Sequence, residues 1–149
     1  MNSSAKGDAD QHRLAARFVD GPHVSAPDKA EQRLADWLTD LTPVQAAAIV
    51  DLTGRFPRAR TILLGIAEAS PYLFDLLRAD AARAIRLLEC EPEPHLARLI
   101  ESTCRDVAAA SAEADVMQLL RRMKSEAALL FALCDIGGLW PVIRVTAAL

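Results

Sequence analysis

The chain of 149 residues has few aromatic side chains and no long apolar run. Aromatic residues make up 5% of the chain and apolar residues 52%, so the core must consist mainly of Ala, Leu, Ile and Val. The richness in Ala and Leu favours helix over strand. The longest strongly apolar run, residues 127–134, is far short of the roughly 20 residues that span a bilayer. The N-terminus lacks the apolar region of a signal peptide. We therefore expect a soluble, cytoplasmic protein with no membrane partner.

Charge and cysteine content exclude further classes. The net charge is −3, and acidic and basic residues are interleaved. Nucleic-acid binding usually needs a clustered basic face, so we expect no nucleic-acid partner, and the same lack disfavours a helix-turn-helix. Cys90, Cys104 and Cys134 are odd in number, and no pair has Cys-x-x-Cys spacing. We expect buried or half-buried free thiols, as in a reducing cytoplasm.

The sequence contains no convincing catalytic motif. Carboxylates at Asp-x-Asp spacing can hold Mg²⁺ during phosphoryl transfer, but the only such pair is Asp8 and Asp10, in a polar segment that is best explained as a solvated tail. His12 and His23 lie in the same segment, and His95 has no second ligand at metal-binding spacing. Nothing resembles a nucleophile elbow. We therefore assign no catalytic, cofactor-binding or metal-binding residue.

Apolar residues at three- and four-residue spacing predict a series of helices. Residues 1–26 are polar with little periodicity, so we expect a disordered, mobile tail. No segment alternates convincingly as a strand. The predicted fold class is all-α, a bundle of about seven or eight short helices. The expected helices cover residues 28–40, 43–54, 57–69, 71–78, a stretch after Asp80, a stretch ending near 111, residues 116–134 and a last element from Pro141 that could also be a strand.

Local signals place the ends of these helices. Thr42 and Ser70 each precede a proline, the pattern of an N-cap followed by proline at the first helical position. Asp80 is expected to cap the next helix. Residues 91–94, Glu-Pro-Glu-Pro, predict a break, because each proline removes a donor and displaces its predecessor from helical geometry.

The strongest helical pattern comes last. Its apolar positions alternate in steps of four and three and predict a buried packing seam: Val116, Leu120, Met123, Ala127, Leu130 and Cys134. In residues 135–138, Gly137 and Gly138 are expected to form a helix C-cap rather than a phosphate-binding loop. The chain then stops at Leu149 without a cap, which we interpret as a cut inside an element.

One basic cluster and two tryptophans stand out as further candidates. Arg121, Arg122 and Lys124 could contact a nucleotide phosphate or the acidic surface of a partner. The competing interpretation is a solvated helix face, partly offset by Glu126 four residues after Arg122. Trp37 and the tryptophan at position 140 are expected to be packing anchors at helix ends.

Two blocks of the chain resemble the N-terminal region of the bifunctional glutamine synthetase adenylyltransferase/adenylyl-removing enzyme. The first block, residues 57–83, contains an apolar helix, the sequence Ser70-Pro71-Tyr72, a second apolar helix and Asp80 followed by Ala81. The second block, residues 116–149, contains the basic helix, the Gly137-Gly138 break and a further helix. The resemblance covers roughly residues 33–149. The family's catalytic motif, Gly-Ser followed about ten residues later by Asp-x-Asp, is not in this chain.

The resemblance implies that residues 27–149 are a helical N-terminal segment of the adenylyl-removing half, truncated before the nucleotidyltransferase motif. It implies an enzyme that adds AMP from ATP to glutamine synthetase and removes it by phosphorolysis, with Mg²⁺, under control of a PII-type regulatory protein. Implied partners are glutamine synthetase, this regulator and the missing catalytic domain of the same chain. By itself the segment is expected to bind no cofactor, to be inactive and to have a structural role.

The alternative from the residues is a free-standing α-helical interaction module without catalysis. A complete module should unfold cooperatively. A truncated segment should instead expose an apolar seam and self-associate.

Overall fold

The structure, a computed structural model, describes residues 10–140. Within this range it contains eight α-helices and no strand, which confirms the predicted all-α class and helix number. The expected element from Pro141 onwards lies outside the described residues. The helices are α2 (Leu14–Arg17), α3 (Pro27–Asp40), α4 (Pro43–Arg55), α5 (Pro57–Ala69), α6 (Pro71–Ala79), α7 (Ala81–Glu89), α8 (Pro92–Ala109) and α9 (Glu113–Ile136).

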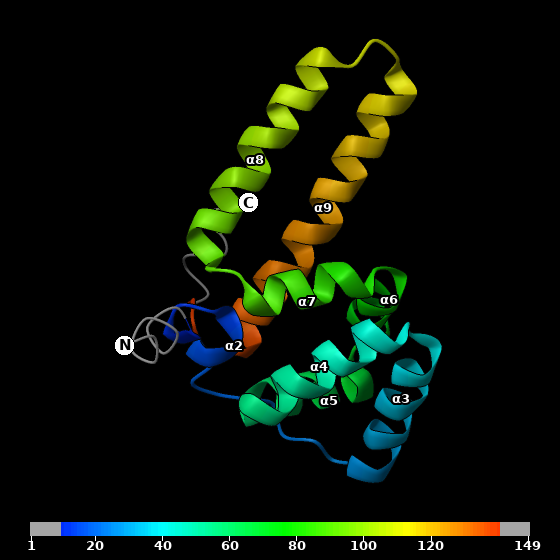
Figure 1. The fold of residues 1–149 in the computed structure, drawn as a ribbon, viewed down its shortest axis with the longest axis vertical. Coiled ribbons are helices and arrows are strands. Elements are labelled where there is room, and N and C mark those ends of the chain that lie inside the picture. Colours follow the sequence, from blue (N-terminus) through cyan, green and yellow to red (C-terminus); the bar gives the residue numbers. More distant parts are fainter. Residues whose placement is uncertain (1–9, 141–149) are drawn as a thin grey trace.

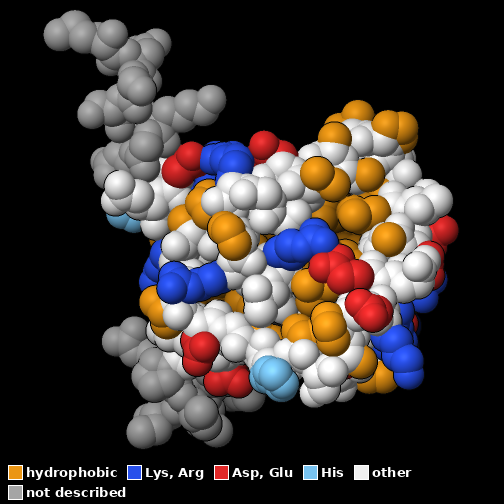
Figure 2. All heavy atoms as spheres, turned by 90° about the horizontal axis from the view of Figure 1, so that it is seen from below, with side chains coloured by type: hydrophobic (Ala, Val, Ile, Leu, Met, Phe, Trp, Pro, Cys, Tyr) orange, Lys and Arg blue, Asp and Glu red, His pale blue; other side chains and the backbone are white. Residues whose placement is uncertain are grey.

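The helices form a body and a projecting hairpin (Figure 1). Helix α5 lies at the centre of the body and packs against α2, α3, α4 and α6. Helices α8 and α9 run antiparallel away from the body, and only the C-terminal half of α9 reaches its core. On the face opposite the hairpin, basic, acidic and apolar side chains are interleaved (Figure 2).

The predicted N-caps are confirmed. The Thr42 hydroxyl accepts from the backbone N–H of Gln45 at 3.3 Å, and the Gln45 side chain accepts from the N–H of Thr42 at 3.3 Å, forming a capping box. Ser70 accepts from Leu73 N–H at 3.3 Å. The Asp80 carboxylate accepts from the backbone N–H of Arg83 at 2.9 Å.

The break predicted over residues 91–94 is wrong in its extent. Helix α7 ends at Glu89, but α8 begins at Pro92, so both prolines lie in its first turn. The first N–H groups of a helix have no intrahelical acceptor. Proline at these positions therefore loses no helical hydrogen bond, and the chain turns over only Cys90 and Glu91.

The prediction of a mobile tail up to residue 26 is wrong for residues 10–26, while residues 1–9 lie outside the described part. Leu14 is 0% exposed and Phe18 1% exposed, both within the main core. The backbone N–H of Leu14 donates to Cys90 O at 2.8 Å, and Val19 N–H donates to Gly137 O at 3.0 Å. The segment is thus fixed to the ends of α7 and α9.

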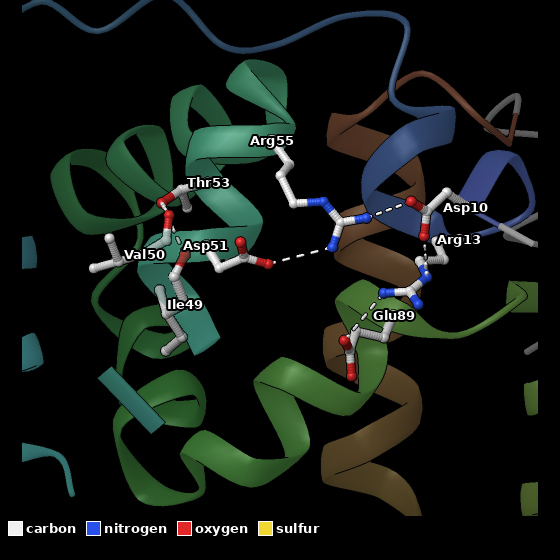
Figure 3. Close-up of polar contacts among 8 residues, drawn as sticks. All are labelled: Asp10, Arg13, Ile49, Val50, Asp51, Thr53, Arg55 and Glu89. Carbon is white, nitrogen blue, oxygen red and sulfur yellow. Dashed lines mark hydrogen bonds and ion pairs between the residues drawn. The ribbon is translucent and has the colours of Figure 1, made fainter. Parts of the chain in front are cut away.

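Ion pairs also hold this N-terminal segment (Figure 3). The Asp10 carboxylate pairs with Arg55 of α4 and, at 3.1 Å, with Arg13. Arg13 reaches Glu89 of α7 at 3.1 Å, and Arg55 also contacts Asp51 at 3.2 Å. Asp10 is therefore not part of a solvated tail, which corrects the interpretation of the Asp-x-Asp pair.

The predicted seam of α9 is buried only in its C-terminal half. Leu130 and Cys134 are fully buried, whereas Val116 and Met123 are half-buried and Leu120 is exposed. Helix α8 covers one side of the seam, but two helices alone cannot enclose it. The periodicity was sufficient to predict the apolar face and could not show what covers it.

We predict opposite effects for two glycine substitutions. In Gly65→Ala the new Cβ would lie 2.1 Å from Pro22 Cγ, so the loop over α5 must shift. We expect a loss of about 1–2 kcal/mol in the free energy of unfolding, since overpacking outweighs the gain in helix propensity. The control Gly54→Ala meets nothing within 4 Å and should gain up to about 1 kcal/mol. Urea unfolding measures both, and equal effects would contradict the packing at Pro22.

Candidate functional site

A polar cluster of three side chains lies where the hairpin meets the body. It joins Arg86 of α7, His95 of α8 and Glu126 of α9. Arg86 donates from Nη2 to Glu126 Oε2 at 2.8 Å and from Nε to Oε1 at 3.2 Å. His95 Nε2 lies 2.8 Å from Oε1 of the same carboxylate. The His95 and Glu126 side chains are only 12% and 13% exposed.

The partners of Glu126 favour its ionised form. Burial alone would raise the pKa of Glu126, but the hydrogen bonds from Arg86 and His95 together outweigh it, and the pKa lies below its usual value. An ionised carboxylate is only an acceptor, so His95 Nε2–H is the donor. Because Arg86 and His95 both donate to Glu126, the cluster acts as a joint between three helices.

A cavity of about 680 Å³ adjoins this joint. Its lining combines the three cluster residues with apolar side chains of α7 and α8 and with polar side chains at the edge: Gln45, Ala82, Ile85, Arg86, Glu89, Cys90, His95, Arg98, Leu99, Ser102 and Glu126. Sequence reasoning missed this site, since the partners of Glu126 are 31 and 40 positions away. The expectation that Glu126 offsets Arg122 is wrong: its carboxylate contacts Arg86 and His95 instead.

A second cluster ties the N-terminal segment to α8. The Arg17 guanidinium forms two parallel hydrogen bonds to Glu93, with Nη1 to Oε2 at 2.7 Å and Nη2 to Oε1 at 3.0 Å. Trp140 Nε1–H adds a bond to Oε1 at 3.2 Å. The Arg17 hydrogen bonds and that from Trp140 lower the pKa of Glu93 to about 2, against burial that would raise it.

Curated proteins similar to this chain share one description. The chain is 66% identical, over all of its length, to the bifunctional glutamine synthetase adenylyltransferase/adenylyl-removing enzyme of Bradyrhizobium sp. (strain ORS 278). It is 55% identical to that of Rhodopseudomonas palustris (strain TIE-1), over 99% of the chain, and 46% identical to that of Xanthobacter autotrophicus, over 95%. The chain is homologous to the N-terminal part of this enzyme.

The homology confirms the resemblance, but it concerns only a part of each relative. The chain spans about 15% of the length of the adenylyltransferase/adenylyl-removing enzymes it matches. No known family profile and no solved structure matches the chain. Across residues 10–140, no helix is long and apolar enough to cross a membrane.

The Mg²⁺ implied for the full-length enzyme does not fit the residues described. Among them, no group of three or more His, Cys, Asp or Glu side chains is placed to hold a metal ion. The carboxylate of Asp10 is engaged by arginines, and Asp8 lies outside the described range. His12 and His23 are exposed and do not line the cavity beside Glu126.

The glycine pair, the two tryptophans and the basic cluster singled out in the sequence are also located in the structure. Gly138 adopts a φ of +71°. The N–H of Leu139 donates to Cys134 O at 2.8 Å, and the N–H of Gly138 donates to Asp135 O at 3.0 Å. These two bonds form a Schellman cap and confirm the predicted capping role. Trp37 and Trp140 are buried anchors, as predicted. Arg121, Arg122 and Lys124 are exposed.

The three cysteines are free, but the prediction of their burial is wrong for one of them. Cys134 is buried and Cys90 half-buried, and burial raises their pKa values to about 12 and about 11. Cys104, on α8, is exposed. Because the thiolate is the reactive form, Cys90 and Cys134 are expected to react slowly at neutral pH.

We predict that Glu126→Gln weakens the joint. A neutral amide accepts weaker hydrogen bonds from Arg86 and His95 and also places an NH₂ group beside them. We expect the free energy of unfolding to fall by about 1–2 kcal/mol, a figure reduced because Arg86 is half-exposed. Urea unfolding measures the change, and Glu101→Gln, at an exposed position of α8, is the matched control. An equal effect at both positions would contradict the role of the joint.

The Glu93 cluster predicts a pH dependence. A carboxyl group whose pKa is lowered on folding stabilises the protein above its unfolded pKa, near 4.5, and loses this contribution as pH falls toward 2. Glu93→Gln should therefore flatten the decline of unfolding free energy between pH 4.5 and 2. Thermal melts across this window test the prediction. Parallel declines for the parent chain and the variant would show that Arg17 does not hold Glu93 ionised.

Proposed function

We propose that this chain is a non-catalytic helical segment of an enzyme that adenylylates and de-adenylylates glutamine synthetase and so regulates nitrogen assimilation. The observation that carries the proposal is the 66% identity over the whole chain to 15% of an enzyme with that description. The polar clusters support a structural role, since their charged groups bind one another and tie helices together.

The proposal extends to the full-length protein. That protein would be a cytoplasmic nucleotidyltransferase that uses ATP and Mg²⁺ and responds to a PII-type regulator. Its metal-binding carboxylates would lie outside this segment, in a catalytic domain of the same chain. Within it, residues 27–149 would belong to the adenylyl-removing half.

A second candidate is a free-standing interaction module. The observation that favours it is the exposure of apolar side chains on the hairpin, at Ile100, Met117 and Leu120. Exposed apolar groups of this kind can mark a protein-binding surface. The whole-chain homology favours the first candidate.

Segment exchange in a full-length relative tests the proposal. In the Bradyrhizobium sp. (strain ORS 278) enzyme, the homologous segment would be replaced by this chain or deleted. We expect the exchanged enzyme to retain AMP addition to glutamine synthetase and AMP removal within about threefold, and the deletion to lower AMP removal by about tenfold or more.

The 149-residue chain alone provides the second part of the test. Incubated with adenylylated glutamine synthetase and inorganic phosphate, it should form no ADP. ADP formation by the chain alone, or full AMP removal by the deleted enzyme, would refute a non-catalytic role in that half. Circular dichroism of each variant establishes that loss of activity does not reflect global unfolding.

A further inference from the structure

The outer half of the hairpin has an apolar surface that the described residues leave uncovered. Ile100, Met117 and Leu120 are 48%, 45% and 39% exposed. In α8 only Pro92 and Thr103 are buried, and in α9 burial begins at Leu129. Each helix of the body, α2 to α7, buries at least two side chains in the hydrophobic core, whereas Pro92 and Thr103 of α8 are not part of that core.

These exposed side chains gather on one flank of the hairpin. His95 and Glu126 touch each other on the flank that faces α7. At about 100° per residue, Ile100 lies about 140° around the axis of α8 from His95. Leu120 lies about 120° around the axis of α9 from Glu126, in the same sense when each helix is viewed from its N-terminus to its C-terminus. In an antiparallel pair, equal rotations bring both residues to the same side. Ile100 and Leu120 therefore lie together, on the flank away from the joint.

Helical spacing adds two residues to this flank. Cys104 is four positions after Ile100, and Met117 is three before Leu120, so each shares a face with its neighbour. All four are exposed. We name Ile100, Cys104, Met117 and Leu120 the hairpin patch.

On α9, the end of the hairpin patch nearer the body is basic, whereas Glu113, four positions before Met117, lies at its outer end. Arg121 lies four positions after Met117, and Lys124 lies four after Leu120. Both are exposed, and within the described part of the chain neither forms an ion pair. The basic cluster noted in the sequence therefore borders an apolar surface, an arrangement that suits an apolar element with carboxylates at its edge.

We propose that the hairpin patch docks on an apolar, carboxylate-edged element of the remaining polypeptide of the full-length enzyme. This inference rests on the proposed function. Two observations favour this occupant: the relatives extend far beyond the 15% of their length that this chain covers, and the basic edge lacks a partner in the described residues. A covalently linked element is also present at a high effective concentration, which gives it an advantage over a separate protein.

The labelling rate of Cys104 tests the docking directly. N-ethylmaleimide would be added to the 149-residue chain and to the exchanged full-length enzyme, and the labelled peptide would be quantified by mass spectrometry. We expect labelling of Cys104 to be at least about tenfold slower in the full-length enzyme, because docking buries the thiol. Hydrogen exchange of residues 99–123 should slow in parallel.

Charge reversal identifies the surface. Arg121→Glu combined with Lys124→Glu should restore fast labelling of Cys104 in the full-length enzyme, because the edge would then repel carboxylates. The matched control is Arg105→Glu, an exposed residue next to Cys104 but about 100° further round α8. The control should leave the protection in place. The 149-residue chain should have the same thermal midpoint with and without these changes.

The outcomes separate this inference from the proposed function. Equal labelling rates in the two proteins, in an enzyme that retains both activities, would overturn the docking and leave the function standing. In the 149-residue chain, protection of Cys104 could grow with protein concentration and be accompanied by a doubled mass in light scattering. This result would identify a second copy of the chain as the occupant and would also overturn the proposed docking. Protection in an enzyme without activity would support docking while refuting the function.

Discussion

The close packing around helix α5 is the constraint on which the body of this protein depends. Four other helices rest on α5, and its surface from Ala59 to Ala67 is almost continuously buried. At Gly65 the loop before α3 crosses so closely that Pro22 fills the space of a side chain. The loop that leads into α3 thus passes directly over α5, on which α3 then packs.

Sequence reasoning succeeded where the information is local. The starts of α4, α6 and α7 were predicted because Thr42, Ser70 and Asp80 cap groups only three residues away. The N-terminal segment was missed because what orders it is distant: Arg17 binds Glu93, 76 positions away, and Arg55 binds Asp10, 45 positions away. A polar segment with a four-residue helix carries no periodic signal of such contacts.

The candidate site shows the same limit. The helical pattern placed Glu126 on α9 and predicted a partner on the same helix, at the spacing where helical side chains meet. In the folded chain, burial beside α7 and α8 directs the carboxylate to Arg86 and His95 instead. Periodicity likewise revealed the apolar face of α9, but how far that face is covered depends on the number of helices that pack there.

Because the joint lies at the base of the hairpin, its few polar contacts influence the position of the whole hairpin. Helix α9 has 24 residues, about 36 Å at 1.5 Å per residue, and its core contacts lie in the C-terminal half. A change of about 10° at the base would move a point about 20 Å outward by about 3–4 Å. That displacement is comparable to the separation of neighbouring side chains. The position of Ile100 and Leu120 relative to the body therefore depends on contacts at the base of the hairpin, among them those of Glu126 with Arg86 and His95, and not on contacts near the patch itself.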